Sequence, residues 1–276
     1  MTWKWNKQMQ FIVFSGVSII LLFAVVFSRL WVDVSQLSTN FNARNLAPSR
    51  EHVFGTDWLG RDMFTRTMLG LSLSIRVGLI GAIGSTIIAV VLGMAAAMMG
   101  KTVDRIVSWL IDLFLSVPHI VTLILISFTV GGGVKGVMIG LIATHWPSLA
   151  RVIRAEVMQV RSAPYVQISR QLGKSNRWIA IHHIVPHLIP QMIIGFMLLF
   201  PHAILHEAAI TFLGLGLSPH EPAIGIILSE SMKYLSSGAW WLAFFPGLAL
   251  LLVVRLFDRM AEHLKTLLDP KDARDK

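Results

Sequence analysis

The sequence predicts an all-α membrane protein with six transmembrane helices. Of its 276 residues, 54% are hydrophobic and only 14% are charged, and the mean hydropathy is +0.66. These values are too apolar for an ordinary soluble domain, and several long runs carry almost no charge. The chain has no cysteine, which excludes disulfides and thiolate metal sites. The bilayer is therefore the expected solvent.

Six segments reach the length of about 20 mostly apolar residues that a spanning helix needs. The first begins near the N-terminus behind two lysines, as a signal peptide does, but no small-residue cleavage site precedes Arg29, so we expect a retained anchor. The fourth is the weakest, because residues 144–148 dilute its hydrophobicity. The segments are residues 10–31, 76–99, 106–130, 134–150, 188–212 and 239–257.

The distribution of Lys and Arg predicts the orientation. With the N-terminus inside, the inner segments carry fifteen of these residues and the outer segments six, which places both termini in the cytoplasm. The net charge of +9 then marks the inner side of a membrane protein, and no nucleic-acid partner is expected. The expected parts are residues 1–31 (N-terminus and first span), 32–75 (external connection), 76–257 (transmembrane core, with a cytoplasmic loop at 151–187) and 258–276 (cytoplasmic tail).

The cytoplasmic loop contains the pattern of a short amphipathic helix. Pro164 suits the first turn of a helix, and Gly173 suits the residue just past its end. Tyr165, Ile168 and Leu172 fall on one face at helical spacing. From the residues alone, such a helix fits two roles equally well: docking on a partner protein or lying on anionic lipid headgroups.

Ionisable groups inside lipid spans are costly and need an explanation. Asp112 is expected to pair with a neighbouring helix. Glu207 lies beside His202 and His206, which are four residues apart and share a helix face. Two imidazoles can bind a divalent transition metal, and polar packing between helices is the alternative. We predict that these three residues line a substrate pathway, with His202 and His206 as weak metal ligands.

The sequence does not predict an enzyme. The stretch HEAAI has Ile210 where a zinc-protease motif needs its second histidine. The stretch GKS at 173–175 resembles the end of a phosphate-binding loop, but Ile168 stands where that motif needs glycine. We find no nucleophile, base and orienting group at usable spacing, and no cofactor site in the chain.

The cytoplasmic loop resembles a signature of the integral-membrane subunits of bacterial ATP-driven importers, which reads Glu-Ala-Ala, three residues, Gly, nine residues, Ile-x-Leu-Pro. Here QIS at 167–169, Gly173 and HIVP at 183–186 keep the spacing, although Gln167, His183 and Val185 replace the Glu, Ile and Leu. Two further stretches are similar to the peptide/nickel branch of these permeases, and the similarity runs from about residue 52 to Pro270. They are FGTDWLGRDMFTRTMLGLSLSIRVGL (54–79) and FLGLGLSPHEPAIGIILSE (212–230).

This resemblance implies the permease fold of type I ATP-binding-cassette (ABC) importers, in the bacterial cytoplasmic (inner) membrane. It implies a heterodimer with a second permease, two cytoplasmic ATPase subunits that hold ATP and magnesium, and an external solute-binding protein. The short helix would be the coupling helix that docks on an ATPase. The residues expected to couple are Tyr165, Gln167, Ile168, Ser169, Leu172, Gly173 and Pro186.

The branch carries more than one kind of cargo. His202 and His206 favour nickel or a small metal chelate, and di- or oligopeptides are the alternative within the family. A secondary transporter or channel is the alternative from another class. Such a protein would need a set of buried acids that couples transport to an ion, or a ring of residues that lines a pore, and Asp112 and Glu207 alone are too few for either.

Overall fold

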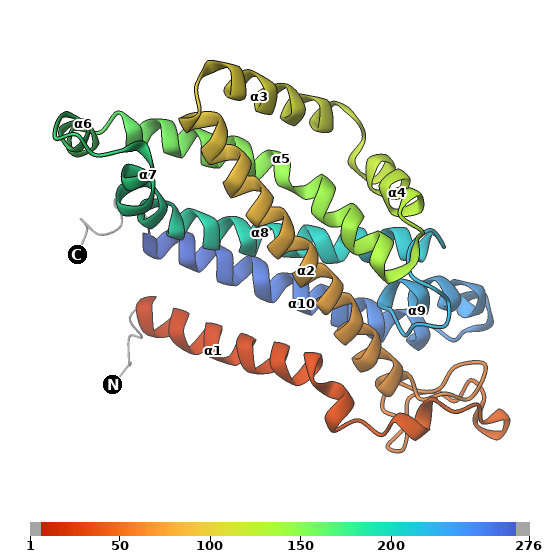
Figure 1. Cartoon of the computed structure of the whole chain (residues 1–276). Helices are drawn as coiled ribbons and strands as arrows, with labels where there is room; N and C mark the ends of the chain where they lie inside the picture. Colours follow the sequence, from red (N-terminus) through yellow and green to blue (C-terminus); the bar gives the residue numbers. More distant parts are fainter. Residues whose placement is uncertain (1–6, 269–276) are drawn as a thin grey trace, which may run out of the picture.

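The computed structural model describes residues 7–268, and these residues form helices joined by turns and loops, which confirms the all-α prediction (Figure 1). The α-helices are α1 (Lys7–Val26), α2 (Met63–Met98), α3 (Lys101–Ser116), α4 (His119–Thr129), α5 (Gly133–Arg161), α6 (Pro164–Gln171), α7 (Asn176–Ile179), α8 (Val185–Phe212), α9 (Ile224–Ser231) and α10 (Trp241–Leu268). Short 3-10 helices are η1 (Ser28–Leu30), η2 (Val34–Leu37), η3 (Phe41–Ala43) and η5 (Met232–Ser237), and η4 (Ala180–Ile184) is a π-helical turn.

Four helices of the described chain are long and apolar enough to cross a membrane. They are Met63–Met98, Gly133–Arg161, Asn176–Phe212 and Trp241–Thr266. The pair α3 and α4 is a fifth candidate if it counts as one span, and Ser15–Val26 in α1 is a shorter apolar helix. The multi-pass character is therefore confirmed, and these helices are compatible with six spans.

The third predicted span is not one continuous helix. The expected segment, residues 106–130, is divided between α3 and α4, which meet at an angle of 101°. Pro118 explains the break, because a proline lacks the N–H of a helical hydrogen bond and disfavours helical angles in the preceding residue. Val117 is accordingly extended, at φ −97° and ψ 141°. The prediction that this segment is apolar is confirmed, but the prediction that it forms one continuous helix is wrong.

Helix α2 begins thirteen residues earlier than its predicted apolar core. The Asp62 carboxylate caps its start by accepting a hydrogen bond from the Thr65 amide at 2.8 Å. With 36 residues, the helix is about 54 Å long at 1.5 Å per residue, which exceeds the roughly 30 Å hydrocarbon core of a bilayer. It therefore extends beyond the lipid core at one or both ends.

Small residues let α2 approach α5 closely. A Cβ added at Gly84 would lie 2.6 Å from Cγ1 of Ile142, and one at Gly93 would lie 2.8 Å from the Ala150 carbonyl oxygen. The Ser85 hydroxyl donates to the Leu141 carbonyl at 3.1 Å across the same interface.

The two ends of the helix bundle differ in character. Helices α6 and α7 lie at one end, together with the first described residues of α1 and the last of α10 (Figure 1). The opposite end carries α9 and the loop between α1 and α2 (Figure 1). The described chain thus starts and finishes on the side of α6.

Buried ion pairs hold the loop before α2 at the end that carries α9. Asp57 is fully buried, and its Oδ2 accepts from Arg61 Nε and Arg66 Nη1, both at 2.7 Å. Its Oδ1 accepts from the amides of Leu59 (2.8 Å) and Arg61 (3.0 Å). Arg66 also donates to Glu230 Oε2 at 2.7 Å, which joins α2 to α9. The charged residues Asp57, Arg61 and Arg66 of the stretch 54–79 therefore stabilise the structure at this end of the bundle.

Candidate functional site

Helix α6 has the boundaries and the exposed apolar face that the sequence predicts. It starts at Pro164, and Gly173 follows its end with a φ of +80°, a left-handed conformation that glycine adopts without strain. Tyr165, Ile168 and Leu172 are 47%, 55% and 73% exposed. Such a row of exposed apolar side chains on a short, capped helix is suited to contact with another surface.

The anchor of α6 is a residue that the sequence analysis did not single out. Val166 is fully buried and belongs to a cluster that includes Val157 near the end of α5, Ile179 at the end of α7 and Ile184 at the end of η4. It faces this cluster, whereas the apolar row on the same helix is exposed. A single buried valine in an eight-residue helix was not distinguishable from the other apolar residues by spacing.

Two positions of the importer signature contact each other. Ser169 Oγ lies 2.9 Å from His183 Nε2, and the rings of Tyr165 and His183 meet edge to face at 5.4 Å. Gln167 donates to the Ser162 carbonyl at 2.9 Å. Pro186 stands in the first turn of α8, which continues from the π-helical turn η4. Tyr165 and Ser169 thus both contact His183, while the coupling role of the residues expected from the sequence stays a prediction.

The acids expected inside the spans have different surroundings. Asp112 accepts a hydrogen bond from Arg151 of α5 at 2.6 Å, which is the pairing with a neighbouring helix that the sequence predicts. Glu207 is fully buried in α8. Its Oε1 accepts from the Thr211 hydroxyl at 3.0 Å, while its Oε2 has no hydrogen-bond partner, although Ser74 lies near the carboxyl group.

Thr211 connects Glu207 to the loop that follows α8. Its Oγ1 also accepts from the Leu217 amide at 3.2 Å. The glycine-rich turn is close here, because a Cβ added at Gly216 would lie 2.2 Å from Thr211 Oγ1. The loop then leads to α9, whose Gly225 would bring a Cβ within 2.4 Å of the Ala208 carbonyl oxygen. The stretch 212–230 is therefore folded back against the end of α8.

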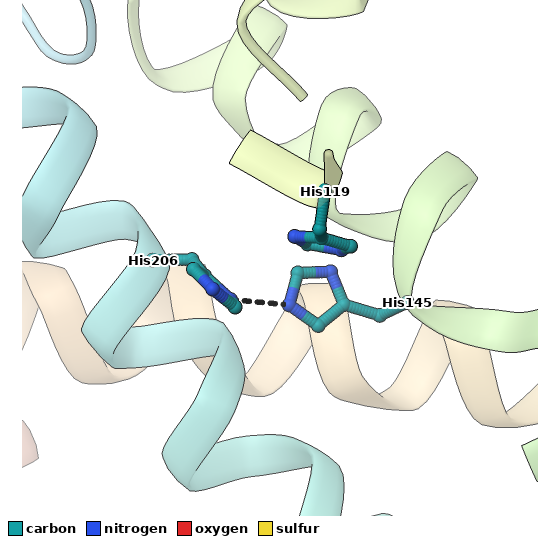
Figure 2. Close-up of side chains that lie close together, drawn as sticks. All are labelled: His119, His145 and His206. Atoms are coloured by element: carbon teal, nitrogen blue, oxygen red, sulfur yellow. Dashed lines mark hydrogen bonds between the residues drawn. The ribbon is translucent and has the colours of Figure 1, made fainter. Parts of the chain in front are cut away.

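Three histidines from three helices meet inside the bundle (Figure 2). His119 is the first residue of α4, His145 lies in α5 and His206 in α8. One ring nitrogen of each lies within 4.8 Å of the others, and His145 Nε2 is 3.1 Å from His206 Nδ1. His145 is 6% exposed, and both nitrogens of His119 are buried and make no hydrogen bond of good geometry.

In the structure, His206 is grouped with His119 and His145, whereas the sequence predicted a pair with His202. His202 is exposed one turn earlier in α8 and does not belong to the three-histidine group. The role of His202 and His206 as a metal pair stays a prediction. His119 and His145 were missed, because their proximity to His206 arises from the packing of α4, α5 and α8 and leaves no spacing pattern in the sequence.

Apolar helices that cross a bilayer several times, with ionisable side chains buried between them, define a multi-pass membrane protein of the transport class. Residues 89–269 match the family of binding-protein-dependent transport system inner membrane components. This chain belongs to that family, in its peptide/nickel branch of ABC importer permeases. The resemblance to this family that the sequence indicates is thereby confirmed.

Relatives cover most of the chain. A dipeptide transport system permease protein of Alkalihalophilus pseudofirmus is 35% identical over 89% of this chain and 81% of its own length. One of the same name from Bacillus subtilis is 32% identical over 91% and 80%. A putative peptide transport system permease protein of Brucella suis is 32% identical over 92% and 87%. Membership in this family does not support the secondary transporter or channel that the sequence analysis kept as an alternative.

Proposed function

We propose that this chain is the permease subunit through which an ABC importer moves di- or oligopeptides into the cell. The observation that carries the proposal is the similarity along nearly the whole chain to permeases named for dipeptide transport. These names support the peptide alternative better than nickel, which the sequence analysis placed first. In this assignment a second permease completes the pore, and an external solute-binding protein delivers the peptide.

Two ATPase subunits on the cytoplasmic side supply the energy in this proposal, and they hold the ATP and magnesium. Helix α6 is the element that transmits their motion. Its exposed apolar row would fill a pocket of an ATPase, with Arg170, Lys174 and Arg177 at the polar rim. The arrangement requires the end with α6 to face the cytoplasm, and both chain termini with it.

Uptake by whole cells tests the cargo. Cells that lack this chain should lose the import of a radiolabelled dipeptide, and the intact chain should restore it. Uptake of radioactive nickel in the same cells provides the comparison. Loss of nickel entry with unchanged dipeptide entry would overturn the peptide assignment and leave the importer assignment in place.

Substitutions on α6 test the coupling role without disturbing the core. Ile168→Asp and Leu172→Asp place charges on exposed positions, so the chain should still insert into the membrane. We expect at least a tenfold loss of ATPase co-purification and of ATP-driven uptake, about 1.4 kcal/mol or more of binding free energy. Phe41→Asp, at a position 63% exposed near the opposite end, is the matched control for co-purification. Full ATPase binding by both α6 variants would contradict the proposal.

A further inference from the structure

We infer that His119, His145 and His206 form a binding site for a divalent transition-metal ion of the zinc, cobalt and nickel class. The inference goes beyond peptide transport and does not depend on it. Among the described residues, these three make up the group of His, Asp and Glu side chains whose ligand atoms come close enough together to hold an ion. Imidazole nitrogen suits zinc, nickel and cobalt, and the absence of carboxylates from the group disfavours calcium and magnesium.

The spacing of the nitrogens is close to that of a metal site. Four ligands at about 2.0–2.1 Å from a tetrahedral zinc lie roughly 3.3–3.4 Å from one another. His145 Nε2 and His206 Nδ1 are already 3.1 Å apart. The third imidazole, His119, has its ring centre 4.3 Å from that of His145 and 4.6 Å from that of His206. Small rotations of the side chains would bring three nitrogens to one ion.

The hydrogen bonds of His145 prepare it as a ligand. Its Nδ1 lies 3.0 Å from the Leu141 carbonyl oxygen, which only accepts, so Nδ1 carries the proton. Nε2 therefore presents a lone pair to His206. Metal-binding histidines commonly donate their second ring N–H to a backbone carbonyl in this way, which fixes the ring and its tautomer.

His119 supplies an independent indication. Both of its ring nitrogens are buried and make no hydrogen bond of good geometry, although the Thr144 backbone lies near the ring. An imidazole without good hydrogen bonds in the interior is destabilising, and such a group calls for an explanation, for example a bound ion. His119 also opens α4 directly after the proline break (Figure 2). An ion here would tie the bent segment of α3 and α4 to α5 and α8.

Three imidazoles leave a fourth position open. A zinc site with three histidines keeps water or another oxygen or nitrogen ligand in that place. The ion would thus remain able to accept one more group from outside the chain. The same geometry serves an ion that stays in the protein and an ion that passes through it.

Metal binding to the full-length chain, in the assembled transporter and purified without a polyhistidine tag, tests the inference. Equilibrium dialysis against Zn²⁺, Co²⁺ or Ni²⁺ should give one ion per chain, and Co²⁺ should produce the visible absorption of a low-coordinate nitrogen site. His119→Ala and His145→Ala should each weaken binding by at least 10–100-fold, about the range seen when only an outer-shell partner is lost.

His182→Ala is the matched control, because it removes an exposed histidine that lies outside both the three-histidine group and the predicted substrate pathway. It should leave both the affinity and the Co²⁺ spectrum unchanged. If His145→Ala fails to fold, the partly buried His119 provides the second variant, since its loss leaves the bond between His145 and His206 in place. Equal binding by the wild type and the His119→Ala variant, or loss of binding only in His182→Ala, would overturn the assignment, whatever the outcome of the peptide experiment.

Discussion

Two buried polar regions of this protein satisfy their groups to different degrees. At the end that carries α9, Asp57 accepts four hydrogen bonds, and Arg66 is shared between Asp57 and Glu230. Arg61 Nη2, which makes no hydrogen bond, still lies 3.7 Å from Glu230 Oε2. In the interior, Glu207 Oε2 and both nitrogens of His119 make no hydrogen bond of good geometry. Asp57 and Glu207 are both fully buried, so burial alone does not account for the difference.

The difference indicates different roles. Buried charges that are fully paired fix one geometry, and removing one partner from such a set is strongly destabilising. Buried groups with open bonding capacity contribute less to stability, and in a membrane interior they mark sites where something else binds or passes. The paired network therefore joins the loop before α2 to α9, while the open groups are candidates for contact with an ion or cargo.

Removing Arg66 should have the largest effect. Arg66→Ala leaves Asp57 with Arg61 alone and takes the short contact away from Glu230, so we expect about 3–5 kcal/mol of destabilisation. Chemical unfolding of the purified chain measures it. The control is Arg259→Ala, which removes an exposed contact of 3.9 Å to Glu262 and should cost at most about 1 kcal/mol. Equal effects of the two variants would show that the buried network does not stabilise the fold.

Removing the Thr211 hydroxyl should have an intermediate effect. Thr211→Val keeps the shape of the side chain but leaves the Leu217 amide without its acceptor and Glu207 Oε1 without its donor. An unpaired buried polar group costs about 1–3 kcal/mol, which should appear as a lower unfolding midpoint. Thr129→Val, at an exposed position whose hydroxyl bonds only within its own helix, should change stability by no more than about 0.5 kcal/mol. A wild-type midpoint for Thr211→Val would argue against the link between α8 and the following loop.

The elements that the sequence predicted well are those with local causes. Pro164 and Gly173 delimit α6 because they act on the backbone where they stand. The break after Ser116 had a local cause too, in Pro118, but hydropathy alone does not distinguish a straight span from a bent one.

The three-histidine group could not be predicted in the same way. His145 and His206 are 61 residues apart in the sequence, and they meet because α5 and α8 pack together. The i,i+4 spacing of His202 and His206 is the only local pattern that these histidines form, and it led to a pair of which one member is exposed. The network of Asp57 and Glu230 was missed for the same reason, since its members belong to distant segments.

Neutralising Glu207 should have the smallest effect on stability and so gives the sharpest test of the comparison. Glu207→Gln keeps an acceptor for Thr211, and a neutral amide costs less to bury than a carboxylate. Because Oε2 has no partner to lose, the unfolding free energy should stay within about 1 kcal/mol of the wild type or rise. Chemical unfolding measures this, and peptide uptake by the same variant tests for a role in transport. Destabilisation as large as that of Arg66→Ala would mean that the carboxylate is paired in the assembled protein, and Glu207 would then belong with the structural charges.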